Sequence, residues 1–486
     1  MSKINLQYYE RQGLKTYFFP FIGFFGVYSK NRKENQQGSN LKFMRAAMDK
    51  DPLAPGFVVN QARDSGSILL LHHTEYIKEF FRKEDDFHKR GFTKSFSFAT
   101  SFVFENGEHA LSLKRSVGRL FMYQNLSKFT PDLCRMITDT LTKFSLDKSL
   151  SSDEFKVVNL EHIMTPIFEK VLNIIVHGRE DMPKIQGLSL LKHIRKITKR
   201  FEQMLRNPLF ALMPWFFEVF QILPIQREIL TSYSSLASFL EVVIKEREES
   251  QTFGDCVLDR LILQNQECKE SGDMKDYIGL KEITGILNVM QLAATESSQS
   301  TSMLSILCLA ERKDLQQTFE EINARVYDKA GITNSKTLDA DPVLNLWMKE
   351  TLRLNISSGN ASIRIATRDV KLKDITVKAG DGVILLNHST KLKAQSFEDP
   401  DEFKLDRFEK KIDHSTLQYQ YFPFFTGKRA CPGRNLGELM VKLSVSHICR
   451  MFEFRKVEGE EYYKDHTFVT YIKNPLLEVR LKKPIV

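Results

Sequence analysis

The stretch FFTGKRACPG, Phe424–Gly433, decides how the rest of the chain is interpreted. It surrounds one sulfur, that of Cys431, with residues that form tight turns. Gly427 permits a turn at positive φ, and Gly433 lets a bulky planar group approach the backbone closely. We expect a helix to begin near Arg434, so that its free N–H groups and positive dipole end face the sulfur and favour the thiolate. The sequence therefore predicts that Cys431 ligates a metal from a rigid loop.

Two other side chains of this loop support the same chemistry. Arg429 adds positive charge and can bind an anionic group such as a propionate. Phe424 offers an apolar plate that excludes water. The alternative is that Cys431 is an inert thiol at a helix N-terminus, which is the usual situation for an isolated cysteine. The composition of this loop argues against that alternative.

The loop resembles the haem-binding signature FxxGxRxCxG of the cytochrome P-450 family, and in particular its eukaryotic microsomal members. The five defined positions are matched by Phe424, Gly427, Arg429, Cys431 and Gly433. The resemblance implies haem b, iron protoporphyrin IX, as the cofactor. It also implies that the Cys431 thiolate is the axial metal ligand, which pushes electron density toward the iron and favours O–O cleavage.

A second motif lies about eighty residues before the cysteine. Glu350-Thr-Leu-Arg353 matches the family's ExxR pair, and the i,i+3 spacing puts both side chains on one helix face. The segment around Arg407 resembles the family's PERF segment. The resemblance implies a Glu350–Arg353–Arg407 ion cluster that holds the loops around the haem in register. An ExxR pair alone is more often a surface ion pair.

Two more cations are expected at the haem propionates. Arg364 lies where family members commonly place a propionate arginine, and a guanidinium fork suits a carboxylate. The alternative for Arg364 is an exposed charge on a strand. The family's WxxxR motif is poorly matched, because Ala110 stands at the tryptophan position and Lys114 at the arginine position. Lys114 or His109 would then replace the missing donor.

The long apolar segment 280–310 is predicted to be a helix that is buried on most sides. Its six residues from Ala293 resemble the family pattern (A/G)Gx(D/E)T(T/S). Ala293, Glu296 and Ser298 match, whereas Ala294 replaces the usual glycine and Ser297 the usual threonine. The resemblance implies that Glu296 and Ser297 relay protons to bound dioxygen beside the small Ala293. The alternative is that all of these residues only pack in a buried helix.

Composition limits the remaining possibilities. The chain of 486 residues is 42% hydrophobic and 27% charged, and its net charge of +9 is spread along its length. No basic segment has a nucleic-acid-binding pattern, so no nucleic acid partner is expected. The six cysteines are widely spaced, which fits a reducing compartment. No run of eighteen apolar residues is present, so no transmembrane helix is expected.

The fold class expected is mainly α with small β-sheets, in a single large cytochrome P-450-type domain with haem between the central helix and the cysteine loop. Apolar patterning and proline spacing predict the following elements: two strands in 56–72, a helical middle from Pro224 to Pro342, a helix at 347–354, strands at 361–372 and 382–387, an amphipathic helix at 437–454 and a hairpin at 471–481.

Domain and pocket boundaries follow from the resemblance. Residues 1–30 are expected to be an N-terminal apolar segment of the kind that follows a membrane anchor, and residues 31–486 the haem-thiolate catalytic domain. The phenylalanine-rich stretches 91–104 and 201–224 are expected to line the substrate pocket. Residues 206–224 either dip into a bilayer or pack as a helix pair on the core.

The function implied is that of a monooxygenase that inserts one atom of dioxygen into an apolar small molecule, such as a lipid, sterol or xenobiotic. Electrons from NADPH would arrive through a separate flavoprotein reductase, because no flavin- or nicotinamide-binding glycine-rich motif is present. A basic rim of Lys428, Arg429 and Arg434 is expected to dock that partner.

A monomer is expected, with peripheral membrane contact. It would lie on the cytosolic face of the endoplasmic reticulum if a lost or weak anchor is assumed, and otherwise in the cytoplasm. The alternatives are a P-450-type isomerase, dehydratase or peroxygenase, and a non-enzymatic haem sensor.

Overall fold

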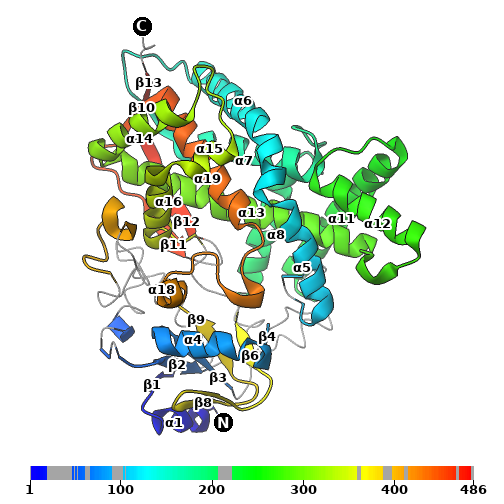
Figure 1. The fold of residues 1–486 in the computed structure, drawn as a ribbon, viewed down its shortest axis with the longest axis vertical. Helices are drawn as coiled ribbons and strands as arrows, with labels where there is room; N and C mark the ends of the chain where they lie inside the picture. The colour runs from blue at the N-terminus through cyan, green and yellow to red at the C-terminus, as the bar shows by residue number, and fades with distance from the viewer. Residues whose placement is uncertain are drawn as a thin grey trace.

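The computed structural model describes residues 2–18, 46–48, 50–51, 53–60, 66–89, 102–103, 105–205, 222–357, 363–386, 397–409, 414–466 and 470–482. Helices gather at one end of the molecule, and a six-stranded sheet with the short helices α1 and α4 forms the other end (Figure 1). The expected fold class, mainly helical with small sheets, is confirmed.

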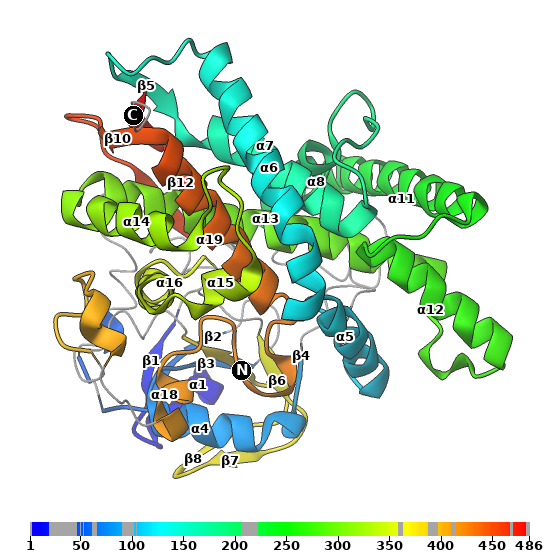
Figure 2. The ribbon, with the colours of Figure 1, turned by 45° about the horizontal axis from the view of Figure 1, so that its top comes forward.

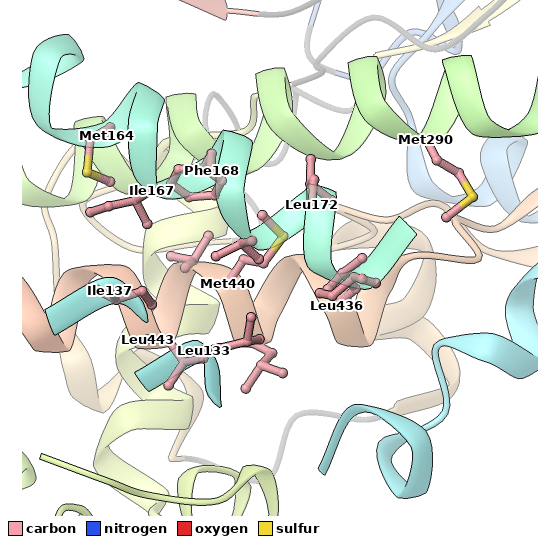
Figure 3. Packing of buried hydrophobic residues seen from close by; sticks show 14 of the residues in the cluster. Leu133, Ile137, Met164, Ile167, Phe168, Leu172, Met290, Leu436, Met440 and Leu443 are labelled. Atoms are coloured by element: carbon pink, nitrogen blue, oxygen red, sulfur yellow. The ribbon is translucent and has the colours of Figure 1, made fainter. Parts of the chain in front are cut away.

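The helical part is built around α13 (Leu280–Ala310), which matches the predicted bounds. Its first turn is closed by the Glu282 side chain, whose Oε2 accepts a hydrogen bond from Gly279 N at 2.8 Å. In both ribbon views α13 runs through the middle of this part, beside α7 (Leu160–His177) and α19 (Arg434–Met451) (Figures 1 and 2). Apolar side chains of α6 (Tyr123–Asp147), α7 and α19 pack together there (Figure 3). Burying these faces stabilises the helices.

The remaining helices have these bounds: α1 Ser2–Glu10, α4 Thr74–Arg82, α5 Glu108–Leu120, α8 Leu190–Leu205, α11 Pro224–Ser250, α12 Val257–Ser271, α14 Lys313–Val326, α15 Ser335–Ala340, α16 Pro342–Leu354 and α18 His414–Gln420. Short 3₁₀ turns are η1 Glu84–Asp86, η3 Met274–Asp276, η4 Leu405–Phe408 and η5 Gly427–Arg429. The helical middle expected between Pro224 and Pro342 is therefore confirmed.

The largest sheet has the order β1-β2-β3-β9-β6-β4. Its strands are β1 Lys15–Tyr17, β2 Gly56–Asn60, β3 Ser67–Leu71, β9 Gly382–Leu385, β6 Arg364–Ala366 and β4 Phe87–Lys89. The strands predicted within 56–72 are β2 and β3, which pair antiparallel. Both are buried along their length, because the sheet packs on both faces.

Three smaller sheets complete the fold. They are β10 (Phe452–Lys456), β13 (Leu476–Leu481) and β5 (Lys156–Asn159); β11 (Tyr463–His466) and β12 (Thr470–Lys473); and β7 (Val370–Leu372) and β8 (Ile375–Val377).

Two local predictions near the C-terminus differ from the structure. The helix predicted at 437–454 is present as α19, but it ends at Met451, and residues from Phe452 form β10 instead. The hairpin predicted at 471–481 does not form, because β12 pairs with β11 while β13 pairs with β10 and β5. The positive φ of Asn474, +53°, and the following Pro475 turn the chain between these two sheets. Only long-range pairing distinguishes this arrangement from a hairpin.

The first residues of the chain belong to the sheet end. β1 pairs with β2 in parallel, and Tyr9 OH donates a hydrogen bond of 2.5 Å to Asp381 Oδ2. The expected boundary at residue 30, the apolar stretch 19–30 and most of the stretches 91–104 and 206–224 lie outside the described residues. None of the helices in the described ranges is both long and apolar enough to span a membrane.

Candidate active site

The loop that carries Cys431 is held by backbone geometry. Cys431 N donates a 2.7 Å hydrogen bond to Phe424 O, which closes the loop across seven residues. Within it Phe425 and Gly427 both have positive φ, +60° and +73°. The positive φ of Gly427 favours glycine there, and a Cβ on it would lie 2.4 Å from Glu84 Oε2 and displace that side chain. The positive φ of a phenylalanine is strained, and such strain is usually found at functional sites.

Gly433 meets a different requirement. Its φ of −91° is accessible to any residue. A Cβ built on it would approach a single protein atom within 4 Å, Cys431 Sγ at 3.9 Å. The described part of the chain therefore does not itself demand glycine at this position. The open space beside the sulfur fits a planar group lying against the loop.

The electrostatics of the sulfur have two opposing parts. Desolvation by the surrounding protein raises the pKa of the Cys431 thiol, although the side chain is exposed, and the Gly433 N–H, Lys114 and Arg434 lower that pKa. The loop backbone and the nearby cations therefore act in the expected direction, and the thiolate stays a prediction. A metal ion at the sulfur would deprotonate it. Among the described residues, no three His, Cys, Asp or Glu side chains are grouped so that they could hold a metal.

A cluster of cations lies beside the loop. Arg364 on β6 and Lys89 on β4 stand directly opposite each other in the sheet register. Arg429 and Lys114 interact with them electrostatically, and Glu84 is the carboxylate that opposes this charge. Like charges placed opposite each other are normally destabilising. An anion bound between them would remove this cost.

The pKa values report the same excess of positive charge. Burial, followed by Arg364, Arg429 and Lys114, lowers the pKa of Lys89 to about 7. Burial lowers the pKa of Arg364 to about 10. A small cavity between Arg364 and Arg429, bordered also by Glu84 and Phe425, opens onto this cluster. The residues present therefore fit a planar cofactor that carries carboxylates.

The structure thus brings Arg364, Arg429 and Lys114 together, as the sequence interpretation requires. It excludes His109 from the cluster, because that ring contacts Glu282 at 2.5 Å near the start of α13. Lys89 was missed, since a single lysine in FHK carries no motif and its position opposite Arg364 depends on strand pairing.

On α13 the two proposed relay residues point to different surroundings. Ala293 is exposed, and Ser297 lies one turn further on the same open face, where its Oγ donates to Ala293 O at 2.6 Å. Glu296 is only 5% exposed and instead contacts Arg195 of α8. Adjacent helix positions differ by about 100°, which separates the two side chains. A direct Glu296–Ser297 pair is therefore not present in this arrangement.

The central helix also lies against the cysteine loop. A Cβ on Gly437, in the second turn of α19, would be 3.6 Å from Ser298 Oγ and 3.7 Å from the Phe424 ring. This close packing places α13, Phe424 and the helix after Cys431 in one cluster. The sequence offered no signal for the role of Gly437, because helical glycines occur for several reasons.

The Glu350–Arg353–Arg407 cluster is buried and continuous. Glu350 accepts hydrogen bonds from Arg353 Nε at 2.7 Å, Arg353 Nη2 at 2.8 Å and Arg407 Nε at 3.0 Å. The two guanidinium groups also donate to backbone carbonyls of residues 398–402. The cluster therefore joins α16 to the loop before the cysteine, and the pair is no surface ion pair.

The expected basic rim is largely neutralised within the chain. Lys428 pairs with Asp85 at 2.6 Å, and Arg434 pairs with Glu438 at 2.9 Å. Arg429 lines the same small cavity as Arg364 and Glu84, and its Nη1 donates to Phe102 O at 3.5 Å. Lys428 and Arg434 are nevertheless exposed, so their charge stays accessible to a partner.

Comparison with known proteins places these features in a family context. The family model described as "Cytochrome P450" matches residues 53–479. A (+)-menthofuran synthase from Mentha piperita is 24% identical over 76% of this chain and 74% of that protein. Cytochrome P450 71A6 from Nepeta racemosa is 23% identical over 85% of each chain. A 3-beta-hydroxylase from Tanacetum parthenium is 30% identical over 46% of each chain.

Proposed function

The chain belongs to the cytochrome P450 family, and on this premise we propose that it inserts one atom of dioxygen into an apolar small molecule with electrons from a separate flavoprotein reductase. Membership of the family makes it a haem-dependent enzyme of the monooxygenase type. The observation that carries the proposal is the open space at Gly433 beside the Cys431 sulfur, next to a cluster of four cations.

Each side chain has a separate role in this proposal. Cys431 would ligate the iron, and the positive φ of Gly427 holds the loop in position. The buried Glu350 cluster keeps the preceding loop in register. Carboxylates of the cofactor would be bound by Arg364, Arg429, Lys114 and Lys89.

When bound, haem supplies the activation of dioxygen, and its thiolate ligand favours O–O cleavage. The chain supplies a small residue, Ala293, and a hydroxyl, Ser297, on the open face of α13. Glu296 would take part in passing protons toward Ser297, and Arg195 pairs with this buried carboxylate. Because Glu296 and Ser297 face apart, a proton passing between them requires a rotation of Glu296 or a bridging water.

An apolar substrate is supported by the phenylalanine-rich composition of the stretches expected to line the pocket. A relative named as a hydroxylase supports oxygen insertion as the reaction. We propose the cytosolic face of the endoplasmic reticulum as the location, with NADPH as the electron source through the reductase.

The decisive experiment replaces the sulfur. Cys431→Ala should abolish the thiolate signature in the reduced carbon monoxide difference spectrum, whereas Cys449→Ala, at a buried cysteine of α19, should leave it intact. An unaltered Soret band in Cys431→Ala would overturn the assignment. Turnover that proceeds without reductase and NADPH would instead favour an isomerase, dehydratase or peroxygenase. This alternative is motivated by Ala294 and Ser297, which differ from the glycine and threonine that are usual in the family.

A further inference from the structure

One residue of β4, Lys89, holds the segment 102–106 at two points. Its backbone is bonded twice by the Asn106 side chain. Lys89 N donates to Asn106 Oδ1 at 2.8 Å, and Asn106 Nδ2 donates to Lys89 O at 3.0 Å. The Lys89 side chain makes the second attachment, because its Nζ donates to Val103 O. The residues just before α5 are therefore attached to the sheet at Val103 and again at Asn106.

The two backbone bonds occupy the open edge of the sheet. β4 is the last strand of the six-stranded sheet, and Lys89 stands opposite Arg364 of β6. The N–H and C=O groups of one residue point to the same side of an antiparallel strand, so those of Lys89 point away from β6 and toward Asn106. Lys89 and Arg364 therefore form a non-hydrogen-bonded pair, the kind in which opposite side chains lie closer together.

The attachment to Val103 depends on charge. Burial and neighbouring cations lower the pKa of the Lys89 amine, and these cations are Arg364, Arg429 and Lys114. A charged donor makes a hydrogen bond about twice as strong as a neutral one does. Carboxylates at this cluster would favour the ammonium form of Lys89. Its three N–H groups allow it to contact a carboxylate and Val103 O at the same time. A bound carboxylate therefore strengthens the attachment.

The segment also reaches the helical core. Phe102 is 5% exposed and belongs to the same hydrophobic cluster as the buried side chains of α13 and α19. On the opposite side Arg429 Nη1 donates to Phe102 O at 3.5 Å. The segment therefore lies between the cation cluster and the helical core, and Phe102 is part of the stretch 91–104 that we expect to line the substrate pocket.

We propose that Lys89 and Asn106 are positioning residues that couple the carboxylates of the bound cofactor to the placement of the segment 102–106 in the wall of the substrate pocket. Carboxylates strengthen the bond from Lys89 to Val103, and the bonds of Asn106 keep Val103 within reach of Lys89. Such coupling is reciprocal, so loosening the segment weakens the binding of the cofactor. The inference rests on the proposed function, because it needs haem as the cofactor.

The coupling is tested by the rate of haem loss from the haem-loaded protein to an excess of apomyoglobin. Asn106→Ala removes an uncharged side chain whose bonds go to the backbone of Lys89. It should nevertheless speed haem loss several-fold. In a Lys89→Met background the same change should have almost no further effect, because the attachment to Val103 is already lost. An effect of Asn106→Ala that is equal in both backgrounds, or absent from both, would overturn the coupling.

Hydrogen exchange of the haem-loaded protein, measured by mass spectrometry on fragments covering 102–106, reports the segment itself. Lys89→Met and Asn106→Ala should both accelerate exchange there several-fold. Lys89→Arg keeps a charged donor and should slow exchange again relative to Lys89→Met. Exchange in Lys89→Met that matches the unmodified protein would refute the positioning role.

The matched control is Lys83→Met. Lys83 Nζ also donates to a backbone carbonyl, Lys371 O at 2.5 Å, but it does so between the end of α4 and β7. This change should alter neither haem loss nor exchange at 102–106, and an effect as large as that of Lys89→Met would contradict the inference. A chain that takes up no haem would instead contradict the proposed function. A chain that binds haem and loses it at one rate in all variants would contradict the coupling alone.

Discussion

Glu350→Gln should destabilise the protein by far more than the loss of an ordinary ion pair. The Glu350 and Arg353 side chains are 0% exposed and that of Arg407 is 6% exposed. The substitution leaves the shape of the side chain almost unchanged but removes the negative charge to which both buried guanidinium groups donate. The glutamine NH₂ group would also face an N–H donor of Arg353, at a position where the carboxylate oxygen of Glu350 accepts a hydrogen bond.

The magnitude follows from the contacts. Glu350 accepts four hydrogen bonds, three from Arg353 and Arg407 and one from Lys404 N at 3.0 Å. Hydrogen bonds to charged groups contribute about 1.5–3 kcal/mol each, but they are not additive here. The glutamine carbonyl retains some of them, and breaking a buried pair costs about 3–5 kcal/mol. We therefore expect a loss of about 3 kcal/mol, a large part of a typical total stability of about 5–15 kcal/mol.

The assay is urea unfolding of the haem-loaded protein at fixed haem concentration, followed by circular dichroism. The control is Glu249→Gln, which breaks an exposed pair with Lys245 whose side chains are 67% and 76% exposed. That change should cost less than about 1 kcal/mol. If Glu350→Gln and Glu249→Gln differ by less than about 1 kcal/mol, the cluster does not hold the loop as we argue.

Three other predictions follow from the site and the N-terminal segment. Gly427→Ala should lower thermal stability, because the residue has a φ of +73° and its new Cβ would lie 2.4 Å from a carboxylate oxygen. Gly433→Ala should leave the stability of the haem-free chain unchanged but reduce haem uptake in a titration. Lys89→Met should weaken haem binding in the same titration. The pKa of Lys89 is about 7 in the folded protein, against an ordinary value of 10.5. Between these two values the unfolded chain binds more protons than the folded one, so the haem-free protein should become more stable as pH rises through that window. In Lys89→Met this pH-dependent gain in stability should be absent. Tyr9→Phe leaves the buried Asp381 without its phenolic donor and should cost about 1–3 kcal/mol in urea unfolding.

Each of these has its own control or contrary outcome. Gly187→Ala, at φ of +78° but in open space, separates backbone strain from the clash at Gly427. Unchanged haem affinity in Lys89→Met would remove that residue from the carboxylate site. A Tyr9→Phe variant as stable as the unmodified protein would mean that the Tyr9 hydroxyl contributes nothing to the stability of the sheet end.

Local patterns were sufficient for several parts of the fold. The helix at 280–310 and the strands around residues 56–72 were predictable, because apolar spacing and turn residues act over short distances. The end of the helix near Met451 was not, since the apolar alternation of Phe452 and Phe454 fits either a helix or a strand. Pairing of β10 with the distant β13 decided between them.

The candidate site divides in the same way. The loop motif identified Cys431 and its glycines, and the spacing of Glu350 and Arg353 put them on one helix face. Lys89 and Arg195 belong to no sequence motif, although Lys89 lies opposite the expected propionate ligand Arg364 and Arg195 contacts the motif residue Glu296. The direction of Glu296 away from Ser297 was also hidden, because a sequence motif lists neighbours along the chain without stating which helix covers each face.

By itself the sequence determined the cysteine loop, the central helix and the family to which they belong, because these depend on residues close together in the chain. Only the tertiary structure decided which charges meet at the loop, where Glu296 points and how β12 and β13 pair. Those outcomes depend on contacts between segments up to several hundred residues apart. Burial and strand register bring such segments together, and neither can be read from local spacing.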